Sequence, residues 1–360
     1  LLLILFTFGV FSIVAGSSPY APATCETAEC IELAADIIRD RDPTADPCVD
    51  FFRYSCGGWQ ERHPIPDDRS IWGTFNILSE ENKVVVRGIL EKEESTAESA
   101  EVPALRAARM LYRACVDTDS LEAAGSAPLA PMLAAVSLTD AASPSTPGAF
   151  DAELTDALEY IYRVGAGAFV GAPIGVDDKD PSRYSVFLGQ GGLGLPSREY
   201  YLGKKDLMED EKAAGYASIV GRLLALAGAA DNGAAASALG RAVLGFEAEL
   251  AEIQLPKAML RNPDLVYNPT PIVELEVTMP TVGWTQLMRS LSGVSGFEAI
   301  NATVVVQSPA YVAKLQELIT RTPRATLSAY LQTRIIVWAT PMLSASFRDA
   351  LADFDRLVYG

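Results

Sequence analysis

The chain has 360 residues, of which 49% are hydrophobic, so it is long enough to bury one large core or two smaller ones. Its formal net charge of −17 is unsuited to following a phosphate backbone, because that task needs clustered lysine and arginine. No nucleic acid is therefore expected as a partner. We interpret the acidic excess as a well-solvated surface rather than as a cation-attracting function.

The first 15 residues are uncharged and almost wholly apolar. A membrane-spanning helix needs ~20 such residues, so we expect this stretch to be what is left of a longer segment. It fits either a signal anchor or the core of a cleavable signal peptide, and residues 16–24 follow as a Pro- and Ser-containing tether. Residues 1–24 are thus expected to be a truncated anchor or signal peptide plus tether. Both readings place the rest outside the cytosol, at the plasma membrane or secreted.

All five cysteines lie in the first third of the chain, namely Cys25, Cys30, Cys48, Cys56 and Cys115. In an extracellular setting they should mostly pair, and an odd number leaves at least one without a partner. Either a free thiol exists or partners lie on sequence not shown. A structural zinc cluster is disfavoured, because such sites use close C-x-x-C pairs with further Cys or His, which these spacings do not supply.

Helical periodicity of apolar residues is the prevailing pattern along the chain. It predicts helices over 26–40, 74–91, 102–117, the first part of 124–147, two within 207–255 and a last one over about 344–359. Ser308-Pro309 and Thr322-Pro323 predict two further helix starts, since each places a capping hydroxyl before a proline. Residues 46–68 are dense in Pro, Gly, Cys and aromatic residues and predict an irregular, cross-linked segment. Residues 165–192 predict a β-hairpin with a long turn at 177–182.

Little in the chain points to catalysis by itself. A hydrolytic zinc site typically shows H-E-x-x-H, and the chain has a single histidine, His63. Prolines at 64 and 66 prevent a helix there, so we expect His63 to be a packing residue in a loop. The same histidine would have to serve any Ser or Cys triad. The glycine-rich run 189–194 lacks the Gly-Lys-Ser/Thr ending of a phosphate loop and predicts a turn. Acidic pairs such as Asp177-Asp178 are expected to be solvated, and Asn301 heads one N-glycosylation motif.

A long motif, D-P-C-V-D-F-F-R-Y-S-C-G-G-W at 46–59, closely resembles a pattern of the neprilysin and endothelin-converting-enzyme family. Cys25 and Cys30 precede it at the family's spacing. Further matches are V-D-D-K-D at 176–180, L-G-L-P-S-R-E-Y-Y at 193–201, L-V-Y-N at 265–268 and S-F-R-D-A at 346–350. The resemblance therefore covers residues 25–360.

The resemblance implies the mainly α-helical, non-catalytic lobe of a two-lobed zinc metallopeptidase, with a small β-hairpin and with the catalytic lobe absent. Residues 25–360 would form this N-terminal domain, and 25–68 would pack on the missing catalytic lobe. The parent would use zinc to hydrolyse short peptides outside the cell, while this chain would hold no metal and no catalytic residue. By the same resemblance Cys25 pairs with Cys30, whereas Cys48, Cys56 and Cys115 have partners beyond Gly360.

Two hypotheses about function follow. In the first, the chain is a catalytically incomplete piece of an extracellular zinc metalloendopeptidase, whose partners are peptide substrates, its own catalytic lobe and, through the uncleaved N-terminal segment, the membrane. In the second, it is a non-enzymatic neprilysin-like binding or decoy module. The sequence downstream of Gly360 would separate them, because an in-frame H-E-x-x-H indicates the enzyme.

Overall fold

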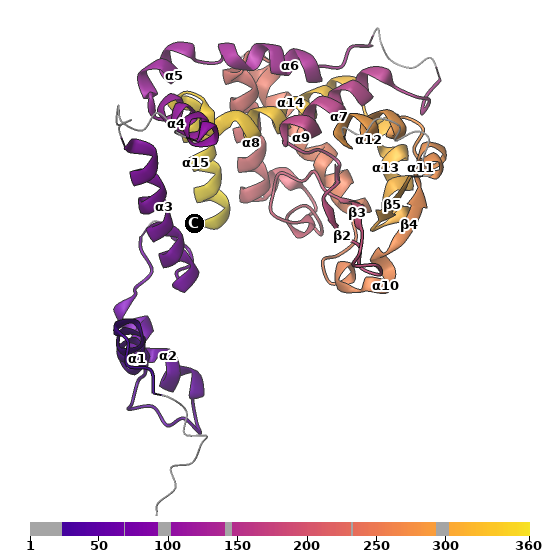
Figure 1. The fold of residues 1–360 in the computed structure, drawn as a ribbon. Coiled ribbons are helices and arrows are strands. Elements are labelled where there is room, and N and C mark those ends of the chain that lie inside the picture. Colours follow the sequence, from indigo (N-terminus) through magenta and orange to yellow (C-terminus); the bar gives the residue numbers. More distant parts are fainter. Residues whose placement is uncertain (1–23, 68, 93–101, 141–145, 232, 293–301) are drawn as a thin grey trace, which may run out of the picture. The chain divides into compact units, whose positions relative to one another are not determined.

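The computed structural model describes residues 24–67, 69–92, 102–140, 146–231, 233–292 and 302–360 (Figure 1). These residues fall into two compact units, 1–89 and 90–360, each of which is described by itself. The predicted signal or anchor segment and Asn301 lie outside the described residues. The fold is mainly helical with a small sheet, which confirms the fold class predicted from the sequence. Among the described residues, no helix combines the length and the apolar character needed to cross a membrane.

The first unit consists of three helices, α1 (Ala28–Asp40), α2 (Phe51–Arg62) and α3 (Thr74–Glu91), the last of which runs two residues into the second unit. The prediction of an irregular segment over 46–68 was wrong for its central part, which is α2. The Asp50 side chain caps this helix by accepting a hydrogen bond from the Arg53 amide. The glycines inside α2 allow close packing, since a Cβ on Gly58 would collide with the carbonyl oxygens of Arg39 and Arg41 at the end of α1.

Helices make up most of the second unit. Their bounds are α4 (Pro103–Val116), α5 (Thr118–Ala124), α6 (Ala130–Val136), α7 (Ala152–Val164), α8 (Glu211–Leu226), α9 (Ala234–Ile253), α10 (Pro263–Val266), α11 (Ile272–Thr278), α12 (Trp284–Ser292), α13 (Pro309–Arg321), α14 (Arg324–Ala339) and α15 (Ala345–Tyr359). Short 3₁₀ turns lie between them, namely η1 (Ala127–Leu129), η3 (Arg198–Tyr200), η4 (Leu207–Glu209), η5 (Met259–Arg261) and η6 (Thr340–Met342).

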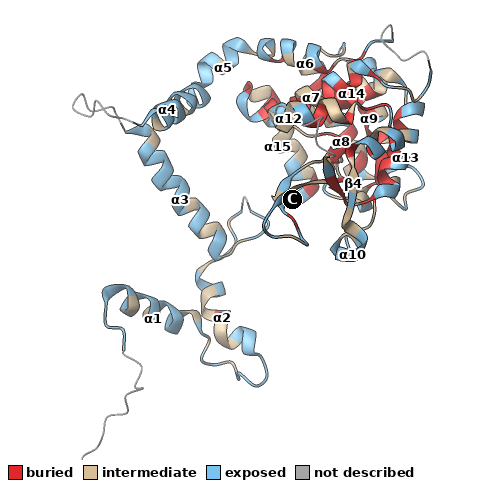
Figure 2. Cartoon of the chain, turned by 45° about the vertical axis from the view of Figure 1, so that its right-hand side comes forward, coloured by how far each residue is buried: buried red, intermediate tan, exposed pale blue. Residues whose placement is uncertain are grey.

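The core of the second unit lies among α7, α8, α9, α13 and α14, where Figure 2 shows the buried residues gathered. Helices α8 and α9 approach closely because Gly240 of α9 faces the Ala217 carbonyl of α8, where a Cβ would collide. Beside them, the rings of Phe169, Phe246 and Tyr330 pack on one another with centroids 4.8–5.8 Å apart. Such aromatic contacts are favourable beyond the area that they bury.

A small sheet lies beside this helical core, with strands β1 (Val170–Gly171), β2 (Ile174–Val176), β3 (Tyr184–Gln190), β4 (Asn268–Pro271) and β5 (Thr303–Val306). The predicted hairpin is present, because β1 and β2 both pair antiparallel with β3. The sheet continues beyond the prediction: β5 pairs parallel with β3, and β4 pairs antiparallel with β5. The strand order is β1-β3-β5-β4, with β2 beside β3.

Candidate functional site

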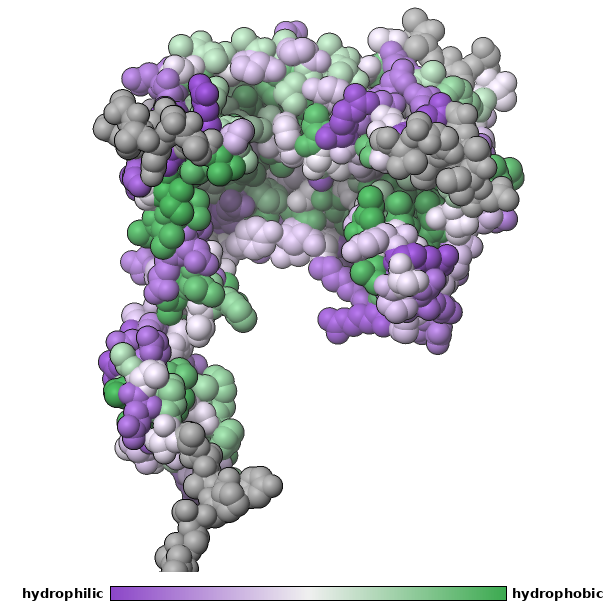
Figure 3. Space-filling view, in the orientation of Figure 1, coloured by the Kyte–Doolittle hydropathy of each residue, from purple (hydrophilic) through white to green (hydrophobic). Residues whose placement is uncertain are grey.

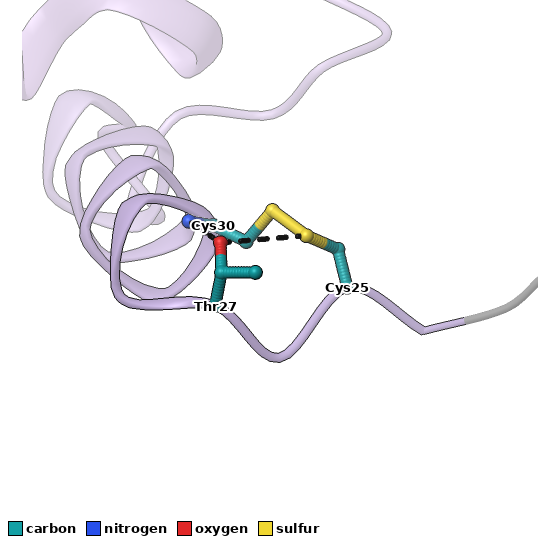
Figure 4. Close-up of a disulfide and its surroundings, with 3 residues drawn as sticks. All are labelled: Cys25, Thr27 and Cys30. Atoms are coloured by element: carbon teal, nitrogen blue, oxygen red, sulfur yellow. Dashed lines mark hydrogen bonds between the residues drawn. A yellow bond between two sulfur atoms is a disulfide. The ribbon is translucent and has the colours of Figure 1, made fainter.

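Cys25 and Cys30 form a disulfide at the start of α1, with their Cα atoms 5.9 Å apart (Figure 4). Thr27 lies between them and caps α1, since its hydroxyl oxygen accepts a hydrogen bond from the Cys30 amide. The cross-link therefore fixes the chain just before the helix begins. Cys48 and Cys115 are exposed free thiols and Cys56 is a half-buried one, so the expectation that these three have partners beyond Gly360 stays a prediction.

His63 ends α2, where it is half-buried against the preceding turn. Its Nδ1 lies 2.8 Å from the Trp59 carbonyl oxygen, and its ring stacks on the Trp59 ring with centroids 4.5 Å apart. This is the packing role expected from the sequence. Within the described ranges, no group of three or more His, Cys, Asp or Glu side chains is placed to hold a metal ion.

The glycine-rich run 189–194 leaves the end of β3 and is tied to α9 and α14 rather than opening a helix. The Tyr330 hydroxyl donates to the Gly192 carbonyl oxygen at 2.9 Å, and the Gly194 amide donates to Glu247 at 3.0 Å. Gly192 has φ +87°, and a Cβ there would collide with the Tyr330 hydroxyl. The run is thus a packed turn, as its composition predicted, and its glycines allow the close approach of two helices.

Glu247 of α9 forms the centre of a buried polar cluster that also holds the L-P-S-R-E-Y-Y segment. The hydroxyls of Tyr201 and Tyr216 donate to its two carboxylate oxygens at 2.5 and 2.8 Å. The Tyr201 hydroxyl in turn accepts from the Leu195 amide at 2.9 Å. With the bond from Gly194, these contacts join the loop after β3 to helices α8 and α9.

The electrostatics of this cluster follow from its burial. Removal from water raises the pKa of Glu247, while the donors Tyr201, Gly194 and Tyr216 oppose that shift. The pKa of both tyrosines is raised, first by burial and then by the Glu247 charge. Arg334 of α14 adds positive charge nearby, and its Nε donates to the Gly167 carbonyl oxygen at 3.2 Å. Each polar group of the cluster has a partner, as buried polar groups require.

A second cluster joins two motifs that lie 90 residues apart in the sequence. Asp177 of V-D-D-K-D accepts hydrogen bonds from the hydroxyls of Ser185, at 2.6 Å, and Tyr267 of L-V-Y-N, at 2.9 Å. It also accepts from the amides of Lys179 and Asp180 at 3.0 and 3.1 Å. The Lys179 Nζ lies 4.8 Å from the centre of the Tyr267 ring. The hairpin turn is thereby fixed to the segment between α10 and β4.

The Asp177 carboxylate is buried and accepts hydrogen bonds, so the expectation that the acidic pair Asp177-Asp178 is solvated was wrong for Asp177. The Ser185 hydroxyl, followed by the Lys179 amide, the Tyr267 hydroxyl and the Asp180 amide, lowers its pKa against the opposing effect of burial. A carboxylate held ionised by so many donors is a poor general base. The sequence placed Asp177 and Tyr267 in motifs without showing that they meet. Glu247 stood in no motif, and nothing in its helical surroundings marked it as buried.

Comparison with known proteins relates this architecture to a family. Residues 47–360 match the N-terminal region described as Peptidase family M13. The chain is 30% identical over 343 residues to endothelin-converting enzyme 1 of Mus musculus, covering 94% of this chain and 43% of that protein. It is 30% identical over 366 residues to the endothelin-converting enzyme homolog of Locusta migratoria, covering 98% of this chain and 49% of that protein. The chain thus spans less than half the length of these relatives.

Solved structures show the same relationship. The zinc metalloprotease Zmp1 of Mycobacterium tuberculosis, solved with an inhibitor, superposes with a TM-score of 0.71 at 26% identity, over 89% of this chain and 46% of that one. PepO of Lactobacillus rhamnosis shares the fold, with a TM-score of 0.63 at 18% identity over 84% of this chain and 45% of that one. The chain belongs to peptidase family M13, the family of neprilysin and the endothelin-converting enzymes, and corresponds to its N-terminal helical portion.

Proposed function

We propose that the chain is the N-terminal portion of an extracellular zinc metalloendopeptidase that hydrolyses short peptides. The observation that carries the proposal is the family match over residues 47–360 together with coverage of only 43% of endothelin-converting enzyme 1. The zinc ligands are then expected in the part of the relatives that this chain does not cover. In this proposal the present residues shape and support the peptide-binding chamber and take no part in the chemical step.

The exposed surface of the first unit supports the proposal that a partner lobe packs against it. Gly57 is the only buried residue among its described positions, so the unit has no hydrophobic core of its own. Large apolar side chains are exposed instead, with Val49 83% and Phe51 69% exposed in the segment 25–68, and Phe75 87% exposed further on. Exposed apolar area on this scale typically marks an interface. We propose that residues 25–68 pack on the catalytic lobe.

The cysteines fit the same proposal. A disulfide such as Cys25–Cys30 is stable in an oxidising compartment, which supports a location outside the cytosol. Exposed Cys48 and Cys115 and half-buried Cys56 would pair with cysteines of the missing lobe. The proposed membrane attachment rests on residues 1–15 and the proposed glycosylation on Asn301, both outside the described residues.

The test is to read the coding sequence downstream of Gly360 and to express the whole open reading frame in a secretory host. We expect an in-frame H-E-x-x-H and hydrolysis of short peptides that a zinc chelator abolishes and added zinc restores. Replacing the glutamate of that motif should remove hydrolysis while zinc stays bound. A stop codon directly after Gly360, with no peptidase activity, would overturn the proposal in favour of a non-enzymatic binding module.

A further inference from the structure

The strand pairing leaves one backbone edge of the hairpin facing outward. In the antiparallel ribbon of β2 and β3, the Phe187 amide donates to the Pro173 carbonyl oxygen at 2.9 Å and the Asp177 amide donates to the Arg183 carbonyl oxygen at 3.0 Å. Residues 173, 175 and 177 therefore point their backbone groups toward β3. Because this direction alternates along a strand, the amide and carbonyl groups of Ile174 and Val176 point away from β3.

The other edges of the sheet are closed by specific side chains. Val170 of β1 also points its backbone groups outward, and the Tyr162 hydroxyl accepts from its amide at 3.3 Å and donates to its carbonyl oxygen at 2.9 Å. At the opposite edge, β4 carries Pro269 and Pro271, which have no amide hydrogen to offer. Within the described part of the chain, β2 pairs with β3 alone, so its outer edge stays open.

An apolar surface accompanies this open edge. Ile174, Val176 and Tyr184 share one face of the ribbon and are 69%, 49% and 77% exposed. Toward the core the same face continues through half-buried Val186 to buried Leu188. Figure 3 shows hydrophobic side chains gathered over the strands that Figure 1 labels β2 to β5, above a hydrophilic tip. Exposed edges with apolar faces are normally blunted, because they recruit further strands.

Hydrogen bonds hold the turn of the ribbon, and an exposed carboxylate follows β2. The bonds that Asp177 accepts from Ser185 and Tyr267 fix the turn beside β2, so the edge needs little ordering on binding. Asp178, two residues after Val176, is exposed and makes no hydrogen bond or ion pair with another described residue.

We propose that the outer edge of β2 is a docking site for an extended, basic peptide, which adds a strand beside Ile174 and Val176. Apolar side chains at alternate peptide positions would lie on the face of Ile174, Val176 and Tyr184, because directly opposed residues share a face of the sheet. A basic group near the peptide end would pair with Asp178. The inference rests on the proposed function, since it takes peptides as the ligands, and adds a contact outside the zinc site.

The experiment measures binding alone, on the 360-residue chain, by fluorescence anisotropy. The probe is a fluorescein-labelled peptide of alternating valine and serine with an arginine at each end. Two further peptides carry N-methyl groups, one on all valine amides and the other on all serine amides. Because only alternate amides of an added strand face its neighbour, one methylated peptide should lose at least about tenfold in affinity and the other should bind like the parent. Equal binding by both would overturn strand addition.

Variants of the chain test the same geometry. Val176→Pro removes an amide that points away from β3, so it should weaken binding about tenfold while Val176→Thr, which keeps the amide, should weaken it by less than about threefold. Circular dichroism checks that both variants fold. If Val176→Pro unfolds, the two N-methylated peptides measured on the unaltered chain still test whether the peptide adds a strand. Asp178→Asn should weaken binding about two- to fivefold and reduce its salt dependence.

The outcomes separate this inference from the proposed function. Hydrolysis is not read, so an inactive whole protein would leave a positive binding result standing. If the whole protein is active but the chain binds neither the parent peptide nor either methylated one, only the docking site is overturned. Concentration-dependent dimerisation that Val176→Pro abolishes, without peptide binding, would assign the edge to a second copy of the chain and contradict the peptide proposal.

Discussion

Glu247 is a fully buried carboxylate whose two oxygens accept hydrogen bonds from Tyr201, Tyr216 and the Gly194 amide. The cost of removing the group from water is offset by these donors and by the nearby charge of Arg334. The cluster links the loop after β3 to the helical core. The cluster therefore holds the loop in place. This requires both side-chain oxygens of Glu247 to accept hydrogen bonds.

Glu247→Gln should destabilise the chain by about 1–3 kcal/mol, because an amide group replaces one acceptor and leaves a buried donor without a partner. The measurement is the free energy of unfolding from urea titration at neutral pH. Glu249→Gln on the same helix is the matched control, since Glu249 is half exposed and pairs with Arg321 at the surface. Its effect should stay below about 1 kcal/mol. Equal effects of the two substitutions would show that the buried cluster adds nothing to stability.

The ionisation of Asp177 makes the stability of the folded chain depend on pH, and the direction of its pKa shift sets the sign of this dependence. Its pKa in the folded chain is lowered, chiefly by the Ser185 hydroxyl, whereas an unfolded aspartate titrates near ~3.9. The stabilisation by its ionised form is therefore fully present above about pH 5 and is lost as the pH falls below the unfolded value toward the folded pKa. The urea midpoint of the unaltered chain should exceed that of Asp177→Asn at pH 7, and the difference should shrink below about pH 4.

Asp178→Asn is the control for this pH series, because no donor in the described residues holds the Asp178 carboxylate. Its urea midpoint should follow that of the unaltered chain at each pH. A gap between Asp177→Asn and the unaltered chain that stays constant from pH 7 to about pH 3 would contradict the assignment of the stabilisation to the ionised carboxylate.

Sequence reasoning reached part of these clusters. The motifs named Asp177 and Tyr267, yet their contact depends on pairing between β3, β5 and β4, which no local pattern records. The burial of Glu247 could not be predicted, for a simpler reason. A glutamate in an alanine-rich helix has the same local pattern whether it faces water or the core, and only the packing of α8 and α9 decides between them.

At the scale of elements, regular periodicity was the reliable signal. Helix α3 was predicted over 74–91, and the structure has it over Thr74–Glu91. Helix α2 was missed because Gly57 and Gly58 lower its helix propensity. These glycines instead allow α2 to pack closely against the end of α1, which no local pattern shows. Strand β4 was missed because its two prolines are typical of loops, and an edge strand is where a sheet tolerates them.

The contact between α1 and α2 provides a test. Gly58→Ala should loosen this helix pair by about 1–3 kcal/mol, because its Cβ would meet the Arg39 and Arg41 carbonyl oxygens and force the helices apart. Amide hydrogen exchange across α1 and α2 measures the loss of protection. Gly88→Ala in α3 is the control, since a Cβ there meets open space and should strengthen its helix by ~0.5–1 kcal/mol. Unchanged exchange in Gly58→Ala would refute the close approach.

At the scale of the whole molecule, the two units differ in how they hold apolar residues. The second unit buries a continuous cluster that includes Phe169, Tyr330 and Leu315. The described part of the first unit buries only Gly57, and Figure 2 colours its helices almost entirely as exposed or intermediate. Apolar side chains are among the exposed ones on all three helices. Helix α4 of the second unit also exposes Met110 and Leu111. Large exposed apolar surfaces typically mark a site of contact with another surface.

The chain from Thr24 to Gly360, purified alone, should therefore bind a hydrophobic dye and associate at micromolar concentration. Phe51 and Phe52, which are 69% and 63% exposed, contribute strongly to this surface, so the pair Phe51→Ser and Phe52→Ser should lower both dye fluorescence and light scattering. Gln60→Ser on the same helix is the control, because Gln60 is exposed and polar, and should change neither signal. The expected contrast arises because removing apolar area weakens association in proportion to the area removed from water, whereas exchanging one exposed polar side chain for another does not. A monomer that is silent to the dye and refolds reversibly would mean that these side chains find cover within the chain itself, and the case for a missing lobe over the first unit would then fail.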